Sequence, residues 1–348
     1  MKIQTFMTNL LILILGVFLG AFGYYLSERL GDIEEAPRTK IKFQLQWMDQ
    51  AQFIGFYVAK HNNYYRDEGL DVELVPGGFN TDPILRVENG DAQLGSATGD
   101  QVIIRANRGA AIRGISTVYN TSLVCFMSHV TDNINSVQDF RGRTIGVYSG
   151  FDSENVLRSL LLLHNIKESD VKIVPAGALA AFERGDVTIW GSYIINEPIS
   201  EKEKGNNVQC LNPEAFGVEF YSDTIIANKD FLEKNRPAVV AFIRATIRGW
   251  QYAIKNQPEA IQAMYQIDGI TLNNSGDIQA FQTLMLKEAI SHLGYPNQKW
   301  IFSMDRSRWI KMANHLLAIS KITKPADEII DSTIDFNIPT EALKGLSP

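Results

Sequence analysis

The chain has 348 residues, of which 45% are hydrophobic and 21% charged, so its composition excludes wholesale disorder and collagen-like repeats. Its 33 Lys and Arg residues against 39 Asp and Glu residues give a formal net charge of −6, which argues against nucleic-acid binding because that needs a basic surface. Two cysteines, Cys125 and Cys210, are too few for a disulfide scaffold or a four-thiolate metal site. One bridge between them is conceivable, but we expect two buried thiols.

An uncharged and strongly apolar segment opens the chain. No charged side chain lies between Lys2 and Glu28, and residues 10–19 read LLILILGVFL. Positive charge precedes this segment and acidic residues follow it, so the positive-inside rule predicts that the body is exported. The sequence leaves open whether residues 1–30 are a cleaved signal peptide or a membrane anchor. Residues 31–40 are polar, contain Pro37 and indicate a linker.

The body alternates between strand-like and helix-like segments in chain order. Strands are expected at residues 41–45, 69–75, 92–97, 111–119, 123–127, 144–147, 172–174, 187–190 and 223–227. Helical segments are expected at residues 51–62, 82–89, 99–109, 137–140, 153–165, 178–184, 238–256, 260–265, 275–293 and 309–319, with Ser153 as the N-cap of its helix. Such alternation with short connections favours a doubly wound α/β architecture.

Polar corners rich in small residues follow three of the expected strands, at residues 47–52, 95–100 and 148–153. In open α/β sheets, ligands bind beyond the carboxyl ends of the strands, where helix N-termini and backbone N–H groups converge. Together the corners predict a ligand cleft, although each alone is equally consistent with a helix cap.

Catalytic signatures are missing from the sequence. There is no P-loop, no G-x-G-x-x-G after the first strand, no H-E-x-x-H and no G-x-S-x-G, and no two of the five histidines have metal-ligand spacing. We therefore expect no catalytic residue, no metal and no cofactor.

Aromatic and acidic residues occur instead at loop-like positions. Trp47 follows the first strand, and Tyr193, Asn196 and Glu197 follow the strand that ends near residue 190. A flat heterocycle is bound well by aromatic faces and by a carboxylate that accepts its N–H groups. The alternatives are that Trp47 is a core residue and that Glu197 belongs to a solvated turn.

Several motifs occur in one order along residues 41–265. Trp47 opens a W-x(5)-F-x-G-x-Y-V-A pattern, and Tyr64 begins the run YYRDEGLDV, with Asn63 where glycine is usual. Further matches are GDAQLG at residues 90–95, DFRGRTIGV at 139–147, NEP at 196–198 and RGWQYA at 248–253. Together these motifs resemble the NMT1/THI5-like family of solute-binding proteins of ABC importers. The tail from Asp268 is less diagnostic.

This resemblance implies an α/β, two-lobed periplasmic-binding-protein fold of type II, in which the chain crosses twice between the lobes. Lobe 1 would comprise residues 41–127 and 225–348, and lobe 2 residues 128–224. Each lobe would be a sheet flanked by helices, with the ligand in the cleft between them. The protein would be a periplasmic or otherwise extracytoplasmic monomer that serves an ABC permease and ATPase, or a membrane-bound sensor if the anchor is kept.

The resemblance also implies a ligand class, a thiamine-precursor pyrimidine or a riboflavin-like ring. Trp47 and Tyr193 would supply stacking faces, and Phe53, where pyrimidine binders often carry histidine, favours a larger or more apolar ring. The remaining ligand contacts are expected from Gln52, Tyr57, Thr98, Asp100, Ser149, Asn196, Glu197 and Tyr221.

Two other functions fit the resemblance less well. The family includes a fungal thiamine pyrimidine synthase that uses pyridoxal phosphate and iron, but its lysine position is Ala97, its histidine position is Gln101, and its cysteine stretch aligns with the cysteine-free residues 217–221. Without that lysine no Schiff base forms, and without cysteines there are no thiolate ligands. An alkanesulfonate binder would need arginines at the corners, which contain none, and Asp100 would repel an anion.

Overall fold

The computed structural model describes residues 37–175, 179–267, 276–293 and 301–346. The expected leader at residues 1–30 and most of the expected linker lie outside these ranges. Among the described helices, none is long and apolar enough to cross a membrane.

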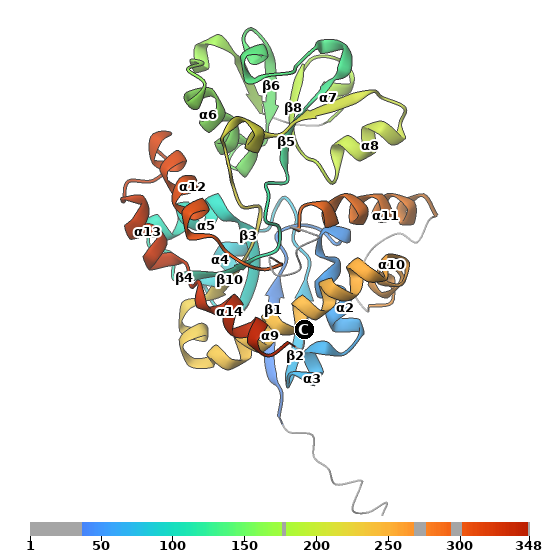
Figure 1. Ribbon diagram of the computed structural model, residues 1–348, viewed down its shortest axis with the longest axis vertical. Coiled ribbons are helices and arrows are strands. Elements are labelled where there is room, and N and C mark those ends of the chain that lie inside the picture. Colours follow the sequence, from blue (N-terminus) through green and yellow to red (C-terminus); the bar gives the residue numbers. More distant parts are fainter. Residues whose placement is uncertain (1–36, 176–178, 268–275, 294–300, 347–348) are drawn as a thin grey trace, which may run out of the picture. The chain divides into compact units, whose positions relative to one another are not determined.

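Two five-stranded mixed sheets form the framework (Figure 1). The first sheet has the strand order β2 (Leu70–Val75), β1 (Thr39–Gln44), β3 (Leu94–Thr98), β10 (Asp223–Asn228), β4 (Ile112–Thr117). The second has the order β7 (Lys172–Pro175), β6 (Thr144–Val147), β8 (Ile189–Tyr193), β5 (Val124–His129), β9 (Val208–Leu211). The chain leaves the first sheet after β4 and returns to it at β10, so it crosses between the sheets twice.

Strand direction is mixed in the same way in both sheets. In the first, β1 pairs parallel with β2 and β3, whereas β10 runs antiparallel to β3 and β4. In the second, β6 pairs parallel with β7 and β8, whereas β5 runs antiparallel to β8 and β9. Because β5 belongs to the second sheet, the expected lobe boundary at residue 127 falls within one of its strands.

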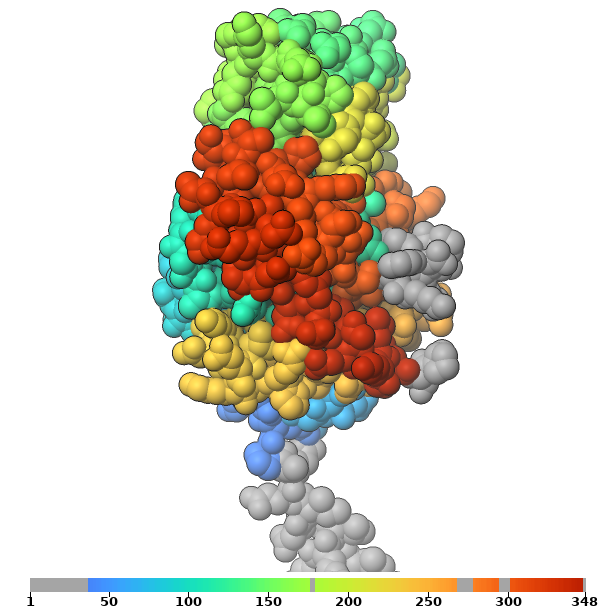
Figure 2. All heavy atoms as spheres, turned by 60° about the vertical axis from the view of Figure 1, so that its left-hand side comes forward, coloured from blue at the N-terminus to red at the C-terminus, as the bar shows by residue number. Residues whose placement is uncertain are grey.

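Helices cover both sheets (Figure 1). Those that follow strands of the first sheet, pack with them, or pack against helices that do are η1 (Ala51–Phe53), α2 (Ile54–His61), α3 (Tyr64–Asp67), α4 (Pro83–Glu88), α5 (Gly99–Asn107), α9 (Lys229–Lys255), α10 (Gln257–Tyr265), α11 (Gly276–Ser291), α12 (Arg306–Ala318), α13 (Ala326–Thr333) and α14 (Asn337–Lys344). Those inserted among the second sheet's strands are η2 (Val130–Asp132), η3 (Val137–Phe140), α6 (Asp152–Leu163), η4 (Glu168–Asp170), α7 (Ala180–Glu183), α8 (Glu197–Glu203) and η5 (Pro213–Phe216). In Figure 2 the C-terminal helices, in red, lie next to green residues of the half that contains the second sheet. Helix α12 contacts α6 of that half.

The core of the first sheet depends on a close helix crossing. Phe43 on β1 stacks on Phe56 of α2 and on Phe242 of α9, with ring centroids 4.6 and 5.1 Å apart. Helices α2 and α9 approach so closely that a Cβ on Gly249 would lie 2.0 Å from the carbonyl oxygen of Gly55. Glycine at position 249 therefore permits the packing that anchors β1 and the loop after it.

Two local expectations were wrong, and a third left out a short helical stretch. The N-cap of α6 is Phe151, without a side-chain cap, and Ser153 lies inside the first turn because the helix starts one residue earlier than its polar sequence suggests. Cys125 and Cys210 form a disulfide, since their strands, β5 and β9, are neighbours. The long helix expected from residue 238 is preceded by a short helical stretch that begins at Lys229, where the Asn228 side chain accepts a hydrogen bond from the N–H of Phe231, and a kink at Asn235 separates the two.

Candidate functional site

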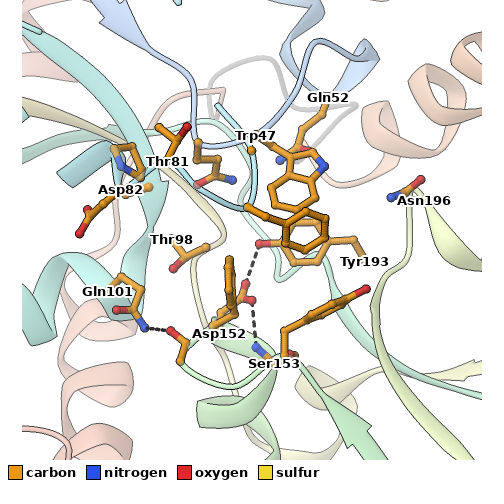
Figure 3. Close-up of a pocket in the computed structure, with 18 of the residues that line it drawn as sticks. Trp47, Gln52, Thr81, Asp82, Thr98, Gln101, Asp152, Ser153, Tyr193 and Asn196 are labelled. Atoms are coloured by element: carbon orange, nitrogen blue, oxygen red, sulfur yellow. Dashed lines mark hydrogen bonds between the residues drawn. The ribbon is translucent and has the colours of Figure 1, made fainter. Parts of the chain in front are cut away.

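A cavity of about 360 Å3 lies among the loops that follow strands of both sheets (Figure 3). Its lining residues are Gln46, Trp47, Gln50, Gln52, Gly78, Phe79, Thr81, Asp82, Pro83, Ile84, Ala97, Thr98, Gln101, Arg105, Tyr148, Gly150, Phe151, Asp152, Ser153, Gly191, Ser192, Tyr193, Asn196 and Glu197. This volume is in the range of small-molecule sites.

The strand ends position these residues. Trp47 follows β1, Thr98 ends β3, residues 148–153 follow β6, and Tyr193 ends β8. Because each of these strands runs parallel to a neighbour, their carboxyl ends meet at the same edge of each sheet. The three polar corners found in the sequence therefore meet at one cavity.

Aromatic rings form much of the wall. Phe79 lies edge-on to Trp47, with ring centroids 4.5 Å apart, and its ring is 6.0 Å from that of Tyr148. Phe151 lies a further 6.1 Å from Tyr148, and Figure 3 shows Trp47 and Tyr193 facing the same space. Phe79 and Phe151 are 61% and 42% exposed, so rings from both sheets' loops remain available to a planar ligand.

Six of the residues expected from the sequence line the cavity. They are Trp47, Gln52, Thr98, Tyr193, Asn196 and Glu197. The Glu197 carboxylate accepts the backbone N–H of Tyr193 at 3.0 Å, and this bond holds the end of β8 against the start of α8. Burial raises the pKa of Glu197, an effect opposed by backbone N–H donors.

The other five lie outside the lining. Phe53 and Tyr57 are fully buried in the first sheet's core, and the Tyr57 hydroxyl donates to Asp49 at 2.8 Å. Tyr221 packs on Trp309 with ring centroids 5.1 Å apart. Ser149 lies between two lining residues, and Asp100 is buried behind the wall. We therefore do not include these five side chains among the ligand contacts that we propose.

Sequence reasoning did not name several residues of the lining as ligand contacts. Asp152, Ser153, Tyr148 and Phe151 belong to the third corner, from which only Ser149 was chosen. Phe79 follows the Gly77–Gly78 pair, a loop signal after β2 that could have pointed to it.

Three buried aspartates surround the cavity. The Asp152 carboxylate accepts the Tyr193 hydroxyl at 2.6 Å and the backbone N–H of Ser153 at 2.9 Å. Burial, with the nearby Asp100 charge, raises the pKa of Asp152 to about 7. Burial likewise raises the pKa of Asp223 to about 7 and that of Asp100 above its ordinary value. Within the described ranges, no group of three or more His, Cys, Asp or Glu side chains is placed to hold a metal ion.

The raised pKa of Asp152 makes stability depend on pH. Because burial moves this pKa from 3.8 to about 7, the native state holds the proton more tightly than the unfolded chain. The carboxyl's contribution to stability is therefore fully present below the unfolded pKa and is lost as the pH rises through the native pKa. Asp152→Asn cannot titrate at this position. We therefore expect the melting temperature of the variant, measured relative to that of the unchanged protein at the same pH, to rise by roughly 3 °C from about pH 5 to about pH 8.

Thermal unfolding without ligand, followed by circular dichroism at both pH values, measures this difference. Asp71→Asn is the matched control, because Asp71 is an exposed carboxyl on β2 and its replacement should follow the unchanged protein. An equal offset for Asp152→Asn at both pH values would contradict the prediction.

Comparison with solved structures defines the class of fold. The periplasmic aliphatic sulphonate binding protein of Escherichia coli superposes with a TM-score of 0.65 at 16% identity, covering 87% of this chain and 99% of that one. The two sheets, their flanking helices and the cavity at the strand ends are those of a type II periplasmic binding protein, so the expected fold class is confirmed.

The sequence comparisons define the family. The family model described as NMT1/THI5 like matches residues 50–260, and the chain belongs to that family. A formylaminopyrimidine-binding protein of Halalkalibacterium halodurans is 27% identical over 237 residues, which are 66% of this chain and 71% of that protein. A riboflavin-binding protein of Chloroflexus aurantiacus is 24% identical over 305 residues, 83% of each chain.

Proposed function

We propose that the protein is an extracytoplasmic solute-binding protein of an ABC importer that captures a small aromatic heterocycle. The observation that carries this proposal is a single cavity lined by aromatic rings from loops of both sheets, among them Trp47, Phe79 and Tyr193. A planar ligand stacked between these rings would touch both halves of the molecule. Such a ligand favours the closed state because it gains contacts there that the open state lacks.

Closure would use hydrogen bonds that connect the two halves. The Asn155 amide on α6 donates to Asp100 of α5 at 2.6 Å, and the Gln101 amide donates to the carbonyl oxygen of Gly150 at 3.0 Å. Two connecting segments also meet, since the N–H of Leu123 donates to Ser222 Oγ at 2.8 Å. We infer that residues 118–123 and 212–222 form the hinge.

The disulfide supports the proposed location outside the cytoplasm. A bridge such as Cys125–Cys210 persists in oxidising compartments and is rare in the cytosol. The hydrophobic leader expected at residues 1–30 would direct export or anchor the chain. We propose a monomer that delivers its ligand to an ABC permease and ATPase, or to a membrane-bound sensor if the anchor is kept.

Pyrimidine and riboflavin ligands both fit this proposal. The expected preference for a larger ring rested on Phe53, and that side chain is buried in the core away from the lining. The relatives' names, one for a formylaminopyrimidine and one for riboflavin, support the two classes equally.

A synthase is the second candidate, because the family includes one. Ala97 and Gln101, which align with the catalytic lysine and histidine of the synthase, both line the cavity. The aligned positions therefore lie where a bound ligand would be. An alanine cannot form an aldimine with pyridoxal phosphate, and residues 217–221 offer no thiolate. The protein as purified, without added cofactor, should carry no covalently bound pyridoxal phosphate, and an internal-aldimine absorbance band that borohydride abolishes would favour the enzyme.

The test of the proposal is ligand identification. Mass spectrometry of small molecules released from purified protein, followed by calorimetric titration with formylaminopyrimidine, riboflavin and taurine, should show binding of at least one heterocycle and not of the sulfonate. Binding of taurine alone, or of none of the three, would contradict the proposed ligand class.

A further inference from the structure

A largely buried ion pair lies at the boundary between the two halves, outside the cavity. The connecting segments at residues 118–123 and 212–222 run there beside α12, which packs on α5 and α13 of the first sheet's half and touches α6 of the second. The Arg308 guanidinium on α12 pairs with the Glu214 carboxylate on η5. Their side chains are only 12% and 17% exposed, and neither lines the cavity. Any effect of this pair on a ligand must therefore act through the position of the halves.

The Glu214 carboxylate connects the outgoing segment to α12. Besides pairing with Arg308, it accepts the backbone N–H of Ser122 at 2.6 Å. Its short helix η5 packs on β5 and α6, so Glu214 belongs to the second half. This one carboxylate therefore binds both the first connecting segment and a helix of the first half.

The Arg308 guanidinium binds the returning segment. It donates to the carbonyl oxygen of Phe220 at 2.9 Å, and its central carbon lies 4.9 Å from the ring centroid of Tyr221. The Tyr221 hydroxyl accepts the N–H of Asp305, just before α12, at 3.0 Å. This end of the returning segment is therefore attached to α12, and the Arg308–Glu214 pair reaches from it to the second half.

Opening of the cavity would act on this ion pair. When the halves rotate about the connecting segments, Arg308 moves with the first half and Glu214 with the second, so the separation of their charges changes. Charge-assisted hydrogen bonds are strong and weaken steeply when their geometry is lost. Arg308 also has an alternative partner, because its Nη1 lies 3.7 Å from the carboxylate of Glu219 in the returning segment. The pair can therefore be made in one arrangement of the halves and broken in another.

We propose that the Arg308–Glu214 ion pair is a hinge latch that favours the closed arrangement, with both side chains as positioning residues for ligand capture. The inference rests on the proposed binding function, because a latch changes affinity only where closure and binding are linked. The latch is made here together with two hydrogen bonds that connect the halves, those donated by Gln101 and Asn155. Weakening the latch lowers the fraction of closed molecules, and the apparent affinity falls with that fraction.

Neutral variants test the latch. In Glu214→Gln the side-chain oxygen can still accept the Ser122 N–H, so this change removes the charge and keeps the bond to the connecting segment. Arg308→Gln removes the other charge. Small-angle X-ray scattering of the ligand-free protein should show a larger radius of gyration for each variant than for the unchanged protein. Calorimetric titration with formylaminopyrimidine and with riboflavin should show about ten-fold weaker binding of whichever compound the unchanged protein binds.

The double variant Arg308→Gln/Glu214→Gln keeps the test valid if a single variant fails to fold. Each single change leaves one largely buried charge without its partner, whereas the double change removes both charges. Because the two residues act as one latch, the double variant should bind no more weakly than the weaker single variant. The control is Arg306→Gln on the same helix, since Arg306 pairs with Asp327 and Asp331 of α13 inside the first half. It should change neither the radius of gyration nor the affinity.

A merely structural ion pair would lower the melting temperature of the variants and leave their scattering and affinity unchanged, and that result would overturn the inference. Loss of affinity without a larger radius of gyration, or the reverse, would overturn it too, because the latch links the two quantities. If neither compound binds the unchanged protein, the proposed ligand class fails, and the scattering of the ligand-free variants alone decides whether the latch exists.

Discussion

Replacing Trp47 with alanine is expected to weaken binding of the heterocyclic ligand by about ten-fold to a hundred-fold. The indole lines the cavity, and its replacement removes a stacking face and buried apolar contact, together about 1.5–3 kcal/mol. The same change should lower the melting temperature of the ligand-free protein little if the ring faces the cavity rather than the core. Calorimetric titration and thermal unfolding of the variant measure both quantities.

The matched control for this prediction is Tyr64→Ala. Tyr64 is a half-buried aromatic residue that packs against the same core, and the Arg248 guanidinium lies 4.1 Å from its ring centroid, outside the cavity. Its removal should leave ligand affinity unchanged. Unchanged affinity in Trp47→Ala would place the site elsewhere, and a large loss of ligand-free stability would favour the alternative that Trp47 is a core residue.

Removing the disulfide is expected to cost about 4 kcal/mol of unfolding free energy. The bridge joins residues 85 apart in sequence, and closing a loop of that length reduces the entropy of the unfolded chain substantially. We expect the Cys125→Ala/Cys210→Ala double variant to unfold at clearly lower denaturant concentration than the oxidised protein. Equilibrium unfolding in urea, followed by tryptophan fluorescence, measures the difference.

Reductant provides the internal control for that measurement. Dithiothreitol should shift the unfolding midpoint of the unchanged protein toward that of the double variant, and it should leave the double variant itself unaffected. If reductant shifts neither midpoint, the two cysteines are thiols in solution, as the sequence alone suggested.

Much of the fold could be predicted from local signals. The strand at residues 144–147 was placed within the bounds of β6, because a short β-branched run between turn residues is a local feature. The short strand β9 and helices α8, α13 and α14 were not predicted, because each is four to eight residues long and is stabilised mainly by what it packs against.

The candidate site shows the same distinction between features that local sequence signals reveal and features that depend on tertiary packing. The sequence by itself determined the family and the three corners, since strand ends and small polar residues are visible in the chain order. Only the tertiary structure decided which aromatic rings face the cavity, because the helix face that Phe53 and Tyr57 present is set by their packing against the first sheet's core. It also decided which polar side chains of the wall are hydrogen-bonded to one another. Asp223 is 177 residues from Gln46 in sequence, and a hydrogen bond between such distant residues exists only once β10 has been inserted beside β3.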